Sequence, residues 1–201
     1  PDITRGSNHL RFILPGGVLR LNTNAPLTYV FDSTWFSLQV PVSLLLGPDE
    51  TLSAGIEDTA RDFEEQTALY WRRWTRRLAV PLEWQDAVIR AAITLKLCQF
   101  EETGAIVAAM TTSIPEAPNT QRNWDYRFCW LRDASLTLAA LIAAGYVEEG
   151  RLWRDWLLRA IAGDPGDLQI MYAVDGAREL PEQVLAHLPG YADSAPVRIG
   201  N

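Results

Sequence analysis

The sequence predicts a mainly α-helical chain that begins with a short antiparallel β region. Apolar and polar residues alternate over residues 36–46, which is typical of strands with one buried face. From Asp58 onwards the apolar period changes to that of a helix. A later segment, residues 133–144, has helical spacing and no charge after its first residue. We therefore expect a β part followed by a helical part, with the boundary where the period changes.

The β part extends over residues 1–57. Alternation from Leu10 to Leu46, with turns at Gly16-Gly17 and at residues 22–26, predicts three or four antiparallel strands. Pro41 has no N–H group for a ladder, so it indicates an edge or a bulge. Because such a meander cannot cover its own apolar face, we expect it to belong to a larger β-sandwich domain.

Residues 58–80 read as a linker helix. Acidic residues lie in its first half, and a cluster of arginines, Arg72, Arg73, Arg76 and Arg77, lies in its second half, which suits the helix dipole. A solvated helix end explains the arginines better than a site for an anionic ligand. The expected helix itself covers residues 58–78.

Residues 81–201 form the helical part. We expect helices at residues 84–102, 133–144 and 147–162, with Gly145 as the C-cap of the second, and a proline-rich loop from residue 163 to 201. The second helix should be buried on all sides. The third has one apolar face, and its charged residues, Glu149 included, should face water. An apolar helix followed by a helix with one apolar face indicates an inner helix followed by an outer one.

Composition excludes several classes of function. The formal net charge of −7 argues against a nucleic-acid partner, and no apolar helix is long enough to span a membrane. The chain has 2 cysteines and 2 histidines, and their spacing fits neither a metal site nor a Ser-His-Asp triad, so we expect no metal and no cofactor. Cys98 and Cys129 read as buried free thiols, which favours a reducing, cytoplasmic location; a single disulfide in an exported protein is the alternative.

Aromatic rings, arginines and carboxylates crowd together in the run Asn123-Trp-Asp-Tyr-Arg-Phe-Cys-Trp-Leu-Arg-Asp133. Sugars present C–H faces that stack on aromatic rings and hydroxyls that pair with Asp and Arg, so this run predicts a sugar site. The alternative is a buried Arg132–Asp133 ion pair that only caps a helix. Asp133 follows Arg132, so it is better suited to accept hydrogen bonds from hydroxyls than to donate a proton. Asp125 reads as a local cap or a partner for Arg122 or Arg127.

This run, extended by Ala134 and Ser135, resembles the substrate-pocket signature of glycoside hydrolase family 15, the glucoamylase family. Three further blocks, at residues 103–116, 168–176 and 196–201, are similar to the segments around that signature, and the resemblance extends from residue 84 to 201. It implies an (α/α)6 barrel, or toroid, of which residues 81–201 would be the first part. It also implies that residues 1–57 are the C-terminal part of the β-sandwich domain that precedes the barrel.

The resemblance also implies an inverting, exo-acting hydrolase that releases glucose from α-glucan oligosaccharides or trehalose. Both catalytic carboxylates, the general acid and the general base, would lie beyond Asn201. The implied substrate-binding residues are Tyr126, Trp130, Arg132, Asp133 and Arg198. A non-catalytic, glucan-sensing relative of the same fold is the alternative, and the oligomeric state stays open.

Overall fold

The structure is a computed structural model, and it describes residues 2–161 and 165–201. The chain divides into two compact units, Pro1–Arg73 and Trp74–Asn201. The expected linker helix is present as α2, Ile56–Thr75, and it crosses the boundary between the units. Glu57 and Asp58 lie in its first turn and Arg72 and Arg73 in its last, so the charges follow the helix dipole as expected.

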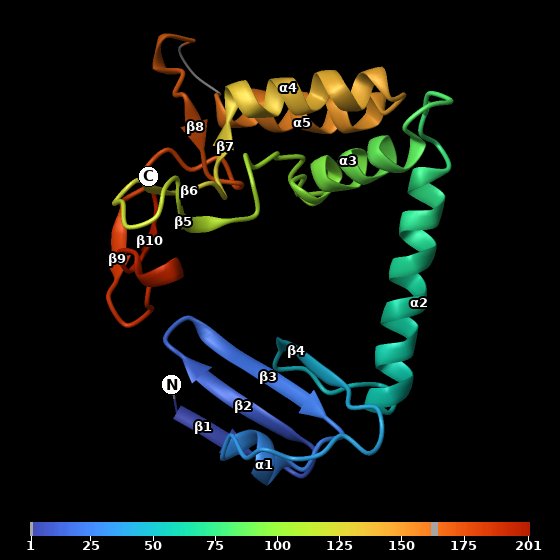
Figure 1. The fold of residues 1–201 in the computed structure, drawn as a ribbon, viewed down its shortest axis with the longest axis vertical. Helices are drawn as coiled ribbons and strands as arrows, with labels where there is room; N and C mark the ends of the chain where they lie inside the picture. The colour runs from blue at the N-terminus through green and yellow to red at the C-terminus, as the bar shows by residue number, and fades with distance from the viewer. Residues whose placement is uncertain (1, 162–164) are drawn as a thin grey trace. The chain divides into compact units, whose positions relative to one another are not determined.

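The first unit contains an antiparallel sheet of 4 strands in the order β1-β2-β3-β4 (Figure 1). Its strands are β1 (Asp2–Arg5), β2 (His9–Leu14), β3 (Gly17–Thr23) and β4 (Leu44–Pro48). The register aligns Leu10 with Leu21 and Leu21 with Leu46. The expected meander of antiparallel strands is therefore confirmed.

The expectation of a strand through residues 36–46 is wrong, because only its last residues, from Leu44 onward, join β4. Pro41 has no N–H group to donate to a neighbouring strand, and the side chain of Asn24 forms the hydrogen bonds with this segment instead. Its Oδ1 accepts a hydrogen bond from the Ser43 N–H at 2.8 Å, and its Nδ2 donates to the Pro41 carbonyl at 3.2 Å. A short helix, α1 (Leu27–Phe31), which the sequence did not predict, begins after Pro26.

The second unit contains the three helices that the sequence predicts, each somewhat displaced or shortened. They are α3 (Gln85–Leu97), α4 (Leu131–Ala143) and α5 (Val147–Ala160). Helix α3 ends before Glu102 because Gln99 forms a bridge with Ile106 and the chain turns at Gly104, where φ is +87°. The predicted end of the third helix, at residue 162, lies outside the described residues.

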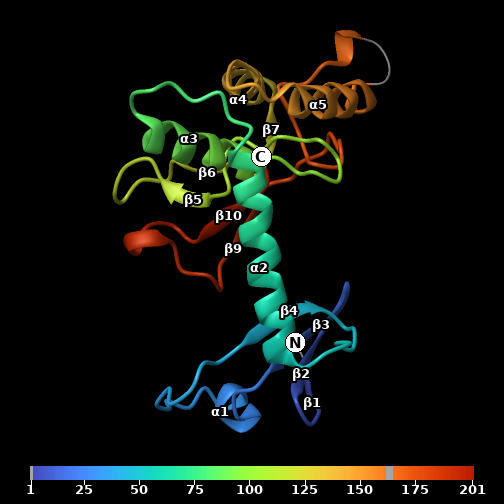
Figure 2. The same cartoon turned by 90° about the vertical axis from the view of Figure 1, so that its right-hand side faces the viewer.

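Helices α4 and α5 lie side by side, joined by a tight turn (Figures 1 and 2). The Gly145 N–H donates to the Ile142 carbonyl and the Tyr146 N–H donates to the Leu141 carbonyl, each at 2.9 Å. This is the Schellman arrangement, and it needs the positive φ of +94° that glycine adopts without strain. The predicted C-cap role of Gly145 is confirmed.

The burial of α4 and α5 differs from the sequence expectation. On α4, Ala134, Leu138 and Leu141 are buried, but Leu136 is 67% exposed, so within this chain the helix is covered on one side only. On α5, Trp156 faces the core as expected, whereas Glu149, expected to face water, is only 7% exposed.

Glu149 is buried because polar partners surround it. Its Oε1 accepts a hydrogen bond from Trp74 Nε1 at 3.1 Å and lies 3.6 Å from the ammonium group of Lys96. Lys96 also contacts Gln99 and Glu101, each at 2.8 Å. A buried carboxylate is tolerated when it is paired and hydrogen-bonded in this way.

The expectation of a plain loop over residues 163–201 is wrong in its described part, which pairs with the central run and with itself. Strand β8 (Met171–Tyr172) pairs with β7 (Cys129–Trp130), and β9 (Gln183–Leu185) pairs with β10 (Val197–Ile199). Two 3-10 turns, η1 (Pro165–Asp167) and η2 (Tyr191–Asp193), complete the described part of residues 163–201.

Strand β5 (Thr112–Pro115) pairs with β6 (Asn123–Asp125). Strands β5, β6, β9 and β10 gather to one side of the three helices (Figures 1 and 2).

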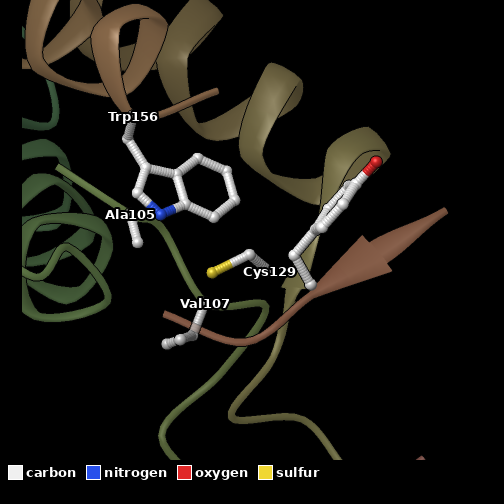
Figure 3. Packing of buried hydrophobic residues seen from close by; sticks show 5 residues of the cluster. Ala105, Val107, Cys129 and Trp156 are labelled. Atoms are coloured by element: carbon white, nitrogen blue, oxygen red, sulfur yellow. The ribbon is translucent and has the colours of Figure 1, made fainter. Parts of the chain in front are cut away.

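A small core holds the central run against α5. Figure 3 shows the Cys129 side chain among Ala105, Val107 and Trp156, and each of these residues is at most 2% exposed. Cys98 and Cys129 are both free thiols, as the sequence predicted, and Cys129 is buried as expected, whereas Cys98 is only partly buried. Among the residues that the structure describes, no helix has the length and apolar character needed to cross a bilayer.

We expect Cys129 to resist alkylation in the native protein. Burial, with a smaller contribution from the charge of Asp175, raises the pKa of Cys129 to about 12 against an opposing hydrogen bond from the Ile106 backbone, so almost no thiolate is present at pH 8. Treatment with iodoacetamide at pH 8, followed by mass spectrometry of the peptides, should show modification of Cys129 only after denaturation in urea. Cys98, which is partly exposed, provides the internal comparison. Rapid native labelling of Cys129 would contradict this packing.

Candidate functional site

A pocket of ≈ 230 Å³ opens at the start of α4, and it gathers four of the five residues predicted to bind substrate. Tyr126, Trp130, Arg132 and Asp133 all line it. The complete lining is Ala108, Trp124, Tyr126, Trp130, Arg132, Asp133 and Asn201. A small concave site with aromatic walls and a few polar groups has the form of a ligand pocket.

The charged pair of the pocket lies in the first turn of α4. The helix begins at Leu131, two residues before the expected start, so both Arg132 and Asp133 are helical, and the carboxylate of Asp133 lies at the positive end of the helix dipole. Arg132 donates a hydrogen bond to Asp133 Oδ2 at 3.0 Å. The Arg132 side chain is 77% exposed and that of Asp133 is 33% exposed. Within this chain the ion pair is therefore not buried, and the donors of Arg132 are accessible to a ligand.

Aromatic rings form the walls of the pocket. The Tyr126 and Trp130 ring centroids lie 6.2 Å apart with an interplanar angle of 41°. Trp124, a third ring in the pocket lining, was not predicted as a site residue, although its spacing from Tyr126 in the sequence indicates this role. In an extended chain, residues two apart point to the same side, so Trp124 in the middle of β6 and Tyr126 just after the strand share a face.

Arg198, the fifth predicted residue, lies outside the pocket lining that the described residues form. Its guanidinium carbon lies 4.9 Å from the centroid of the Trp124 ring, and its NH2 group forms an ion pair with Glu182 at 3.3 Å. Its backbone is anchored to β5, because the Arg198 N–H donates to Ser113 Oγ at 2.8 Å. Arg198 is thus next to the pocket, behind one of its walls.

Asp125 points to the opposite side of the run, and its side chain is 1% exposed. Its carboxylate accepts hydrogen bonds from Arg127 Nε and NH2, both at 2.9 Å, and from the Gly200 N–H at 3.1 Å. Burial alone would raise the pKa of Asp125, but the hydrogen bonds from Arg127 and the backbone N–H groups outweigh it, so the pKa lies below its ordinary value. Of the two expected partners, Arg127 is confirmed, whereas Arg122 pairs with Glu116 at 2.9 Å.

The pocket contains one part of what glycoside hydrolysis requires. The reaction uses two carboxyl groups on either side of the scissile bond. Among the described residues that line the pocket, Asp133 is the one carboxylate, and it is paired with Arg132. No cluster of His, Cys, Asp and Glu suited to a metal ion is found in the part of the chain that the structure describes. The arrangement can therefore bind and orient a polyhydroxylated ring.

Comparison with known proteins agrees with this chemistry. Residues 84–201 match the family model described as glycosyl hydrolases family 15. The chain belongs to that family. The matched region contains α3, α4, α5 and the whole pocket lining.

Relatives named trehalase share extended similarity with the chain. It is 40% identical over 148 residues to the trehalase of Mycolicibacterium smegmatis, covering 72% of this chain and 22% of that protein. It is 37% identical over 137 residues to the trehalase of Thermoplasma volcanium, covering 68% of this chain and 22% of that protein. Trehalase 1 of Sulfolobus acidocaldarius is 44% identical over 118 residues, covering 58% and 21% respectively. The chain therefore spans about a fifth of the length of these relatives. No solved structure shows a significant match.

Proposed function

We propose that this chain forms the binding site for the terminal glucose of an inverting, exo-acting glycosidase, and that trehalose is its substrate. The observation that carries the proposal is the convergence of Tyr126, Trp130, Arg132 and Asp133 on one pocket in a chain of family 15. The exposed guanidinium of Arg132 presents a planar set of donors, and Asp133 presents acceptor oxygens next to it.

Together these groups can hold two neighbouring hydroxyls of one sugar ring. Arg132 would donate to one hydroxyl oxygen, while Asp133 would accept the proton of the other. Tyr126 and Trp130 would cover the apolar C–H face of the same ring. Binding of this kind places the glycosidic bond at the pocket mouth, where the general acid and general base that we expect from residues beyond Asn201 would act.

The choice of substrate rests on the relatives. α-Glucan oligosaccharides and trehalose both end in an α-linked glucose, and the described pocket is suited to that ring in either compound. The relatives reported above are named trehalase, which favours trehalose. Glucan oligosaccharides stay the second candidate because glucoamylases also belong to this family.

We further propose the domain organisation. Residues 1–57 would be the C-terminal part of a β-sandwich domain, residues 58–80 its linker helix, and residues 81–201 the first part of an (α/α)6 barrel. The exposed Leu136 and Ile142 on α4 support the barrel proposal, because further helices would cover them.

The free thiols of Cys98 and Cys129 support a reducing location such as the cytoplasm.

The experiment compares the whole protein with residues 1–201 alone. We expect the whole protein to release glucose from trehalose faster than from maltose. The isolated chain should show no turnover, because Asp133 is the one carboxylate among the described residues that line its pocket. Proton NMR of the first turnover products distinguishes the mechanism. Inversion at one of the two α-anomeric carbons gives α- and β-glucose in equal amounts, whereas retention gives α-glucose alone.

Three outcomes would overturn parts of this proposal. Turnover by residues 1–201 alone would make Asp133 or Asp125 a catalyst. Faster hydrolysis of maltose would identify a glucoamylase-type enzyme. Failure of the whole protein to hydrolyse any α-glucoside, with retained binding of glucose, would favour a glucan-sensing relative.

A further inference from the structure

We infer that Trp124 is a further substrate-contacting residue of the pocket, and that Arg198 and Glu116 are positioning residues that act through its indole ring. The inference rests on the proposed function, because it concerns the same sugar site. It also changes the role expected for Arg198, from a direct contact with the sugar to a support of the wall that the sugar meets.

The indole of Trp124 is held at its polar edge. Its Nε1–H donates a hydrogen bond to Glu116 Oε1 at 2.9 Å. The other oxygen of that carboxylate, Oε2, lies 2.9 Å from Arg122 Nε. Glu116 thus bridges the indole N–H and an exposed Arg122, and the hydrogen bond to Glu116 orients the Trp124 ring.

The face of the same indole is covered by Arg198. Its guanidinium carbon lies 4.9 Å from the ring centroid, and the Arg198 side chain is only 24% exposed. The ion pair with Glu182 and the backbone hydrogen bond to Ser113 Oγ hold that guanidinium in place. A partly desolvated cation over an indole is attracted to the ring.

Two neighbouring segments, the end of β5 and strand β6, and one distant segment, β10, therefore meet at one indole. Glu116 follows β5, Trp124 lies in β6, and Arg198 lies in β10. Trp124 also lines the sugar pocket with Tyr126 and Trp130. A wall that is fixed before the ligand arrives loses little conformational entropy on binding, so the supports of Trp124 should strengthen sugar binding without touching the sugar.

A double-mutant cycle separates action through Trp124 from direct contact. We expect Trp124→Ala to lower kcat/KM for trehalose by about 10- to 30-fold in the whole protein, the scale of one lost apolar contact in a pocket. Arg198→Ala should lower it by about three- to tenfold. In the Trp124→Ala background, Arg198→Ala should have almost no further effect, because the ring that it supports is gone. Most of each loss should lie in KM.

Two conservative variants and one control complete the design. Trp124→Phe keeps an apolar ring and should retain most of the activity. Glu116→Gln keeps an acceptor for Trp124 Nε1, so its kcat/KM should be higher than that of Glu116→Ala. Arg154→Ala, at an exposed ion pair with Asp155 on α5, should leave kcat/KM unchanged. Melting temperatures of all variants show whether any loss is one of folding.

Additive losses for Trp124→Ala and Arg198→Ala would overturn the inference and return Arg198 to direct sugar contact. An unchanged kcat/KM for Trp124→Ala would remove Trp124 from the site. Both results require a wild-type protein that hydrolyses trehalose, so they are distinct from failure of the proposed function, in which wild type and all variants would be equally inactive.

Discussion

Replacing Arg132 by lysine in the whole protein is expected to lower kcat/KM for trehalose by about ten- to several-hundred-fold. A planar guanidinium can hold two neighbouring hydroxyls in fixed geometry, and the single ammonium group of lysine cannot copy that fork. The contacts should tighten as the ring flattens towards an oxocarbenium-like transition state, so kcat as well as KM should change. Initial rates over a range of trehalose concentrations give both constants.

The fold should survive this substitution, since the Arg132 side chain is 77% exposed and its ion pair with Asp133 is open to solvent. Arg154→Lys, at another exposed arginine next to a carboxylate, serves as the matched control and should change neither rate nor melting temperature. A clear fall in melting temperature with unchanged kinetics would contradict the assignment of Arg132 to the sugar site.

Asp125→Asn is expected to produce the largest loss of stability, about 2–4 kcal/mol in the free energy of unfolding of the part of the protein that contains it. Asparagine keeps one acceptor oxygen, but its NH2 group faces the donors of Arg127 or Gly200, so a buried donor would meet a donor. The loss stays below that of a fully buried ion pair, because Arg127 is 47% exposed and can turn to water. A lower apparent melting temperature in the whole protein is the measurement.

The pH dependence of this stability follows from the lowered pKa of Asp125. A carboxyl whose pKa is lower in the folded state stabilises the fold fully above its unfolded pKa, near 3.8, and loses that contribution as the pH falls towards the folded-state pKa. The difference in melting temperature between wild type and Asp125→Asn should therefore shrink below about pH 4. Asp155→Asn, at an exposed carboxylate, is the control and should show almost no difference at any pH. An equal loss in both variants would contradict the buried network.

Local patterns predicted the helices and indicated the run that contains the candidate site, because both depend on residues close in sequence. The helical period located α3, α4 and α5, and Gly145 located the end of α4. Tyr126, Trp130, Arg132 and Asp133 meet in one pocket because they lie within one short run that ends in the first turn of a helix.

Features that depend on long-range partners could not be read in the same way. The alternation before Leu44 resembled a strand, but the side chain of Asn24 provides the hydrogen bonds there. The charge of Glu149 indicated a solvent-facing position, and only the distant Trp74 and Lys96 make its burial possible. Arg198 was expected to contact the ligand, whereas its position over Trp124 depends on how β10 lies beside β5 and β6.

The buried carboxylate of Glu149 also fixes how far α5 can slide along α3. Apolar contacts between helices are non-directional, so several axial registers can bury similar areas. A slide of α5 by one turn, about 5.4 Å, would carry the carboxylate away from both Trp74 Nε1 and the Lys96 ammonium group and leave its charge without these partners. Moving to the next register therefore costs far more free energy than the change in buried apolar area alone would cost. Since α5 follows α4 after a tight turn, the same constraint limits axial displacement of the helix whose first turn presents Arg132 and Asp133.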